Sequence, residues 1–141
     1  MGIDILIIDH EENGIKKIIE NLKGMHGICL YTEKNPESLI QNFKIKTYNI
    51  ILINVSWPEL NTSELISKIK SFNPLCNVIV MIKDCGMFTI IECIEAGACD
   101  YILLPVKDVD HFLNVVSAAV LRVKRWKETL CSPVNEKRVS L

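Results

Sequence analysis

The chain has 141 residues, of which 49% are hydrophobic, 23% charged and only 6% aromatic, with a formal net charge of −1. This composition favours one soluble domain with an aliphatic core. No apolar run reaches the roughly 18 residues that a membrane span needs. Residues 1–8 lack the basic start and cleavage site of a signal peptide, so we interpret them as a strand and expect no membrane association.

Charge is distributed unevenly along the chain. Residues 122–141 hold six basic and two acidic residues, a net charge of +4, so the first 121 residues carry −5. A basic tail can contact nucleic acid or acidic lipid, but cations near a helix C-terminus also favour the helix dipole and solubility. We therefore do not expect direct contact with nucleic acid.

The cysteines form no recognisable metal or redox motif. There is no C-x-x-C pair and no histidine at zinc-finger spacing. This pattern is typical of free thiols in a reducing cytoplasm, where we place the protein. The six are Cys29, Cys76, Cys85, Cys93, Cys99 and Cys131.

Apolar patterning predicts alternating strands and helices. Strands are predicted at residues 3–8, 27–31, 50–55, 78–82 and 100–104. Helices are predicted to begin near residues 13, 35, 62, 87 and 108, the last carrying an apolar stripe that continues to Trp126 and Leu130. Such alternation indicates right-handed crossovers and a parallel sheet that is covered on both faces.

Residues 49–62, NIILINVSWPELNT, are the most informative stretch. An apolar run typical of a buried parallel strand ends at Asn54 and gives way to a polar loop. In open α/β sheets, ligands bind just outside the carboxyl ends of the strands. Asn54 is therefore the first candidate site residue.

Three segments carry a resemblance to a known family: ILIIDHEE at residues 5–12, ILINVSWPELNTSEL at 51–65 and EAGACDYILLP at 95–105. In this order, the chain resembles the receiver domain of bacterial two-component response regulators. The resemblance implies a flavodoxin-like (βα)5 three-layer sandwich, with five parallel strands in the order 2-1-3-4-5. It also implies a receiver-like domain over residues 1–124, followed by a helix extension and basic tail over 125–141.

The resemblance assigns roles by position. In that family, an acidic pair after strand 1 holds magnesium, and an aspartate ending strand 3 accepts a phosphoryl group. A hydroxyl residue ending strand 4 bonds that group, a lysine ending strand 5 pairs with it, and an aromatic residue on strand 5 moves on activation. These roles fall on Asp9 and His10, Asn54, Ile82, Leu104 and Tyr101, and only Asp9 and Tyr101 keep the family's residue type.

The departures remove the chemistry of phosphoryl transfer. Asn54 has no carboxylate that could form an acyl phosphate. Ile82 offers no hydroxyl and Leu104 no positive charge, and we expect both to fill the old pocket with aliphatic surface. The resemblance therefore implies a degenerate pseudo-receiver rather than an enzyme.

The expected metal site is also incomplete. Magnesium prefers hard oxygen ligands, whereas His10 is a softer ligand. Asp9 is the only clear carboxylate, so it is a weak metal candidate, and we expect neither a metal nor a cofactor. Asp9, His10 and Glu11 remain as a residual acidic pocket.

We predict a phosphorylation-independent signalling module that acts through the face formed by helix 4, strand 5 and helix 5, around Tyr101. Its expected partners are a sensor kinase, an effector domain or a second copy, and we expect a homodimer. One alternative is a module that responds to a ligand or metal at Asp9, His10 and Glu11. Another is a decoy that binds a kinase without accepting phosphate.

Overall fold

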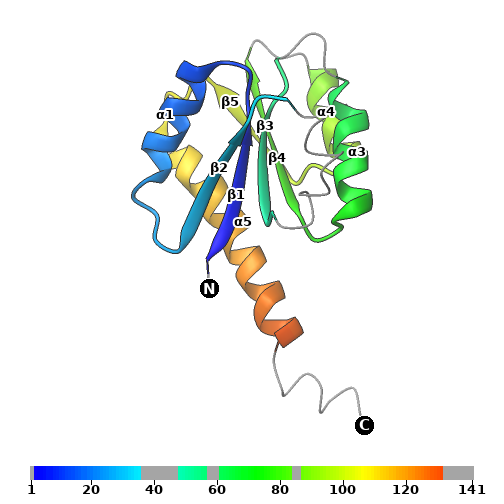
Figure 1. Ribbon diagram of the computed structural model, residues 1–141. Coiled ribbons are helices and arrows are strands. Elements are labelled where there is room, and N and C mark those ends of the chain that lie inside the picture. The colour runs from blue at the N-terminus through cyan, green and yellow to red at the C-terminus, as the bar shows by residue number, and fades with distance from the viewer. Residues whose placement is uncertain (1, 36–47, 57–60, 84–86, 132–141) are drawn as a thin grey trace.

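The computed structural model describes residues 2–35, 48–56, 61–83 and 87–131. Five parallel strands in the order β2-β1-β3-β4-β5 form one sheet between two layers of helices, which confirms the predicted fold (Figure 1). The elements are β1 Ile3–Ile8, α1 Glu12–Leu22, β2 Ile28–Glu33, β3 Ile50–Asn54, α3 Thr62–Phe72, β4 Asn77–Lys83, α4 Met87–Ala96, β5 Asp100–Leu104 and α5 Val109–Cys131. The helix predicted to begin near residue 35 lies outside the described residues, as does Cys85.

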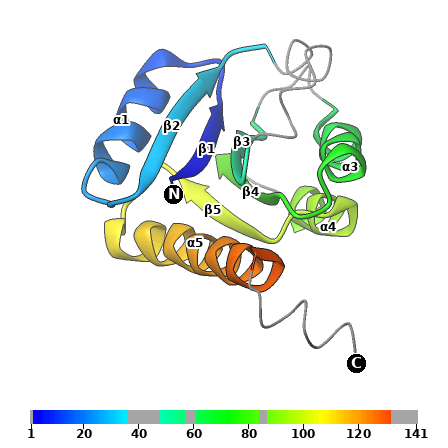
Figure 2. The ribbon, with the colours of Figure 1, turned by 60° about the horizontal axis from the view of Figure 1, so that its bottom comes forward.

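Side-chain alternation along the strands divides the core into two layers. Strands β1, β3 and β4 are aliphatic on both faces because helices cover both sides of the sheet. One layer packs α1 and α5 against residues such as Ile7, Leu52 and Met81. The other packs α3 and α4 against residues such as Ile8 and Ile53. Figure 2 shows the two helix pairs on opposite sides of the sheet.

Strand β2 is longer at its carboxyl end than predicted. The sequence suggested residues 27–31, but the strand runs Ile28–Glu33, with Thr32 and Glu33 paired to Ile7 and Ile8 of β1. These polar residues resemble a loop in sequence, yet β2 is an edge strand whose outer face meets solvent. Pairing with β1 therefore overrides their polarity.

Local signals set two of the helix ends. The Asn61 side chain caps α3 by accepting a hydrogen bond from the Glu64 amide at 3.2 Å. Gly97 follows α4 with φ of +123°, and a Cβ there would lie 2.7 Å from Lys70 Cγ. Glycine is required at this position for both reasons. The Leu104–Pro105 peptide bond is cis.

Helix α5 is the longest element, with 23 residues, and it extends past the body of the domain (Figure 1). Its apolar stripe is buried as far as Val123, whereas Trp126 is 48% exposed and Leu130 is also exposed. Lys127 Nζ donates to the Gly2 carbonyl at 3.1 Å and ties this part of the helix to the start of β1. None of the described helices is long and apolar enough to cross a membrane.

Candidate functional site

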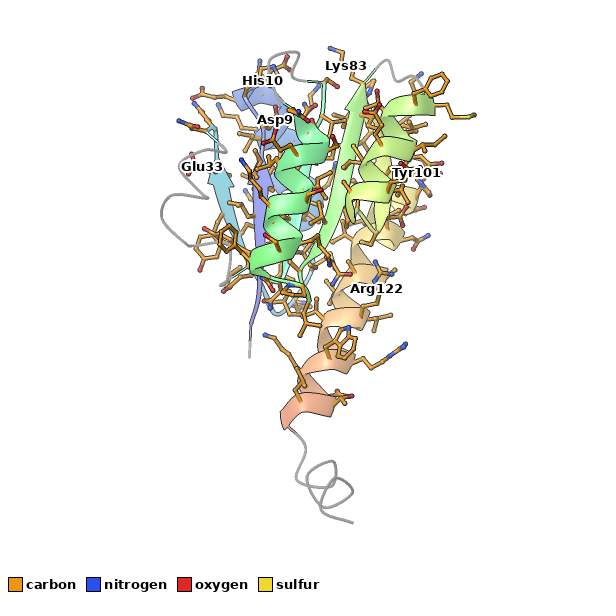
Figure 3. The ribbon with its side chains drawn as sticks, turned by 90° about the vertical axis from the view of Figure 1, so that its right-hand side faces the viewer. Asp9, His10, Glu33, Lys83, Tyr101 and Arg122 are labelled. Atoms are coloured by element: carbon orange, nitrogen blue, oxygen red, sulfur yellow. The ribbon has the colours of Figure 1, made fainter. Side chains whose placement is uncertain are left out.

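The candidate residues meet at one edge of the sheet, where the parallel strands end. Asp9 follows β1, Asn54 ends β3, and Lys83 and Leu104 end β4 and β5. Alternation along the strands directs all four toward the α1/α5 layer. Figure 3 shows Asp9, His10 and Lys83 together at this end of the molecule.

Asn54 and Asp9 are joined directly by a buried hydrogen bond. Asn54 Nδ2 donates to Asp9 Oδ1 at 3.2 Å, and Asn54 Oδ1 accepts from the Ser56 amide at 2.9 Å. The Glu11 amide also donates to Asp9 Oδ1, at 3.0 Å. Asp9 is only 1% exposed and Asn54 5%. The amide thus binds as a donor on one side and an acceptor on the other, a pairing that a carboxylate cannot make.

His10 lies between two carboxylates at the rim of the site. Its Nδ1 is 3.6 Å from Asp9 Oδ1 and its Nε2 is 3.8 Å from Glu11 Oε1. The structure therefore brings together the three residues of the predicted acidic pocket. Among the described residues, however, no group of three or more histidine, cysteine, aspartate or glutamate side chains is arranged to hold a metal ion.

The residues at this edge do not fit the magnesium site that the family implies. Magnesium needs oxygen ligands, commonly one or two carboxylates. Here the Asn54 amide directs its nitrogen, which is not a ligand, toward Asp9, the one buried carboxylate of the described residues. We therefore derive no chemistry that passes through a magnesium ion.

The two aliphatic replacements pack into different layers of the core. Ile82 is buried against α3 and α4, and Leu104 packs against the α1/α5 layer. Leu104 is paired in the sheet with Lys83 of β4. The positive charge that position 104 lacks is thus present on the neighbouring strand.

Ser56 connects the ends of β3 and β4. Its hydroxyl accepts a hydrogen bond from the Lys83 amide at 2.9 Å and lies 3.4 Å from the Lys83 carbonyl. Together with the bond from the Ser56 amide to Asn54, this contact fixes the end of β4 relative to Asn54.

A cleft of about 920 Å³ opens beside these residues. Its floor includes Asp9 and Asn54, and its walls come from α1 and from the segment that connects β5 to α5. Ile82 and Leu104 both line this cleft and contribute aliphatic surface to it, while each also packs against a core layer. The prediction that they close the family's pocket stays a prediction.

Tyr101 lies away from the cleft, on the side of the molecule that carries α4 (Figure 3). Its side chain is exposed, as is that of Leu103 on the same strand. The helices α4 and α5 also carry exposed large apolar side chains. They are Met87, Phe88, Ile91 and Ile94 of α4 and Val109, Leu121, Trp126 and Leu130 of α5.

Comparison with known protein families matches residues 5–116 to the response regulator receiver domain. The transcriptional regulatory protein ZraR of Klebsiella oxytoca is 25% identical over 134 residues, which span 95% of this chain and 29% of ZraR. The regulator NtrC of Klebsiella pneumoniae is 22% identical, over 92% of this chain and 27% of NtrC. The chain thus spans less than a third of either relative.

Solved structures show the same fold. The crystal structure of a response regulator from Thermotoga maritima aligns with a TM-score of 0.75 and 21% identity, over 85% of this chain and 98% of that one. With fold, site position and family match in agreement, the chain belongs to the response regulator receiver domain family. Receiver domains are signalling modules of two-component systems and interact with kinases and effector domains.

Sequence reasoning missed three residues of the site. The sequence around Ser56 and Lys83 does not mark them as site residues, because each acts through a contact with the neighbouring strand. Gly14 of α1 is the third, since a Cβ there would lie 2.9 Å from Asp9 Oδ2. A glycine in the first turn of a helix was the one visible hint, because glycine is unfavourable in helices.

Proposed function

We propose that this receiver domain signals without accepting a phosphoryl group and acts by binding another protein through α4, β5 and α5. The observation that carries the proposal is the hydrogen bond from Asn54 to Asp9. In a phosphate-accepting site, two carboxylates lie close together and need a cation between them. Here a neutral amide stands in place of the second carboxylate and donates to Asp9, so no metal ion is needed to hold two like charges together.

The contacts around Asn54 also support a fixed conformation. Signalling by receivers depends on a two-state element that the phosphoryl group biases. Ile82 is buried where the hydroxyl residue would bond that group, and Ser56 holds the end of β4 to β3. With both contacts made inside the chain, one state is favoured without an added group.

A small-molecule phosphodonor tests the loss of phosphorylation. After incubation with acetyl phosphate and magnesium, we expect the intact mass of the protein to stay unchanged, because no nucleophile is present at Asn54. A receiver domain that keeps the aspartate serves as the positive control. A stable adduct of one phosphoryl group, lost when Asp9 or Glu11 is replaced, would refute the proposal.

The apolar surface around Tyr101 supports protein binding. Soluble monomers rarely expose large contiguous apolar patches, and those that occur often mark interfaces. Charge also favours a second copy as the partner. Exposed acids lie on α4, at Glu92 and Glu95, and exposed bases lie on α5, at Lys124 and Arg125. A two-fold arrangement can pair the acids of one copy with the bases of the other.

Two leucine variants test this face. Leu103 and Leu75 are 54% and 45% exposed, but Leu75 lies between α3 and β4, outside the proposed face. We expect Leu103→Arg to dissociate the dimer in sedimentation velocity experiments and Leu75→Arg to leave it intact, because only the first places a charge in the interface. Dimerisation that survives Leu103→Arg would contradict this assignment. If the protein is a monomer that binds a kinase, the decoy alternative replaces it.

A further inference from the structure

The cleft beside Asp9 has the size and lining of a small-molecule site. Pockets for small ligands measure roughly 300–1,000 Å³ and combine apolar walls with a few convergent polar groups. This cleft measures about 920 Å³. Its apolar lining residues are Ile18 of α1, Val55, Ile82 of β4, and Leu104, Pro105, Val106 and Val109 from the end of β5 to the start of α5.

Asp9 provides an acceptor at the floor of this cleft. Both hydrogen bonds that the described residues donate to Asp9 end on Oδ1. Oδ2 receives neither of these two bonds, and Asp9 is one of the residues that line the cleft. Gly14 leaves the space open, since a Cβ at that position would lie 2.9 Å from Oδ2.

The buried charge of Asp9 also lacks a strong counter-ion. Within the described residues, no lysine or arginine nitrogen lies within 4.0 Å of its carboxylate, and His10 Nδ1 is 3.6 Å away. A carboxylate that is almost fully buried is stabilised strongly by a paired cation. An ammonium group on a ligand meets that requirement at Oδ2.

Two lysines line the same cleft, Lys17 on α1 and Lys83 at the end of β4. The acids in the lining are Asp9, Glu11 and Glu20, so acids outnumber lysines and a simple anion is disfavoured. A second ammonium near the lysines would be repelled, whereas a carboxylate would be attracted. The charge pattern therefore fits a molecule with one group of each sign.

We propose that this cleft binds a small zwitterion of the amino-acid class. The ammonium group pairs with Asp9 Oδ2, the carboxylate lies toward Lys83 or Lys17, and the aliphatic frame contacts Leu104 and Val106. Such a ligand would give a receiver without a phosphoryl acceptor a chemical input. Ligand binding at the cleft is measured without phosphodonors or protein partners. A negative result would therefore count against this ligand site and not against the proposed function.

Three probes with the same number of carbons separate the contributions. We expect 4-aminobutyrate to shift the amide NMR signals of Gly14 and Asn54 at millimolar concentration. Butylamine, which keeps only the ammonium group, should bind about tenfold more weakly, and butyrate should not bind. Equal shifts with butyrate, or none with any of the three, would overturn the proposal.

Variants locate the two charges. Asp9→Asn keeps the shape and removes the charge, so it should weaken 4-aminobutyrate binding at least about tenfold. Lys83→Gln should weaken the zwitterion but leave butylamine unchanged, with Lys124→Gln on α5 as the control. Gly14→Ala tests the same contact by filling the space beside Oδ2, without any change of charge. Unchanged binding in both Asp9→Asn and Gly14→Ala would refute the assigned site.

Discussion

Replacing Asn54 by aspartate would return the family's residue to the strand end, and we expect it to destabilise the protein. The variant loses the donor that now lies 3.2 Å from Asp9 Oδ1 and gains a negative charge there. At that separation, two carboxylates repel by about 5 kcal/mol with an effective dielectric constant of about 20. The introduced carboxyl can avoid this repulsion by keeping its proton.

Protonation sets the upper limit of the cost. Holding a proton at pH 7 on a carboxyl whose ordinary pKa is about 3.9 costs about 4 kcal/mol. We therefore expect N54D to lose about 2–4 kcal/mol of unfolding free energy at pH 7. The pKa of the introduced carboxyl is raised only in the folded state. The N54D variant therefore keeps the stability of the parent protein at pH values below about 4 and loses it as the pH rises through the raised pKa.

Urea denaturation of the parent protein and the N54D variant at about pH 4 and pH 7 measures the difference in their unfolding free energies. The loss should nearly vanish at the lower pH, where the protonated carboxyl can donate to Asp9 in place of the amide. Asn114→Asp, at an exposed position of α5, controls for the added charge. An equal loss of unfolding free energy at both pH values, or no loss at pH 7, would show that the hydrogen bond from Asn54 to Asp9 does not stabilise the folded site.

Two further predictions concern the core near the other end of the sheet. Burial raises the pKa of the Cys76 thiol to about 12. Iodoacetamide should therefore modify the exposed Cys29 in the native protein and Cys76 only after unfolding. Peptide mass spectrometry detects which thiol is modified. Arg122 Nε donates to Asn77 Oδ1 at 2.9 Å, and Asn77 is buried. Arg122→Ala should therefore cost about 1–3 kcal/mol in urea unfolding, and a change below about 0.5 kcal/mol would contradict it.

The sequence predicted those parts of the fold that depend on local patterning. Strands β1 and β5 have the predicted bounds, because mainly apolar runs end at clear polar or proline signals. The edge strand β2 was misjudged because its last residues are polar and are held by pairing with β1. That pairing is a property of the neighbouring strand and leaves little trace in the segment itself.

The candidate site was predictable as positions but not as contacts. Family resemblance placed Asp9, Asn54 and Leu104 at one edge, where the structure has them. It did not reveal that Asn54 donates to Asp9 or that Lys83 is paired with Leu104, because these depend on rotamers and strand register. Sequence alone also did not show that a cleft remains beside Leu104, because side-chain volume does not say which way the side chain packs.

Helix α5 has a geometric consequence for any segment joined to its end. Residues 124–131 follow the last core position, Val123, and advance about 12 Å along the axis. Each residue also turns the chain by about 100°, so the direction in which an attached segment points is set by residue count. One inserted residue would rotate that segment by more than a quarter turn, whereas seven would restore its direction to within about 20°. Signal output through this helix should therefore depend periodically on the length of the connection.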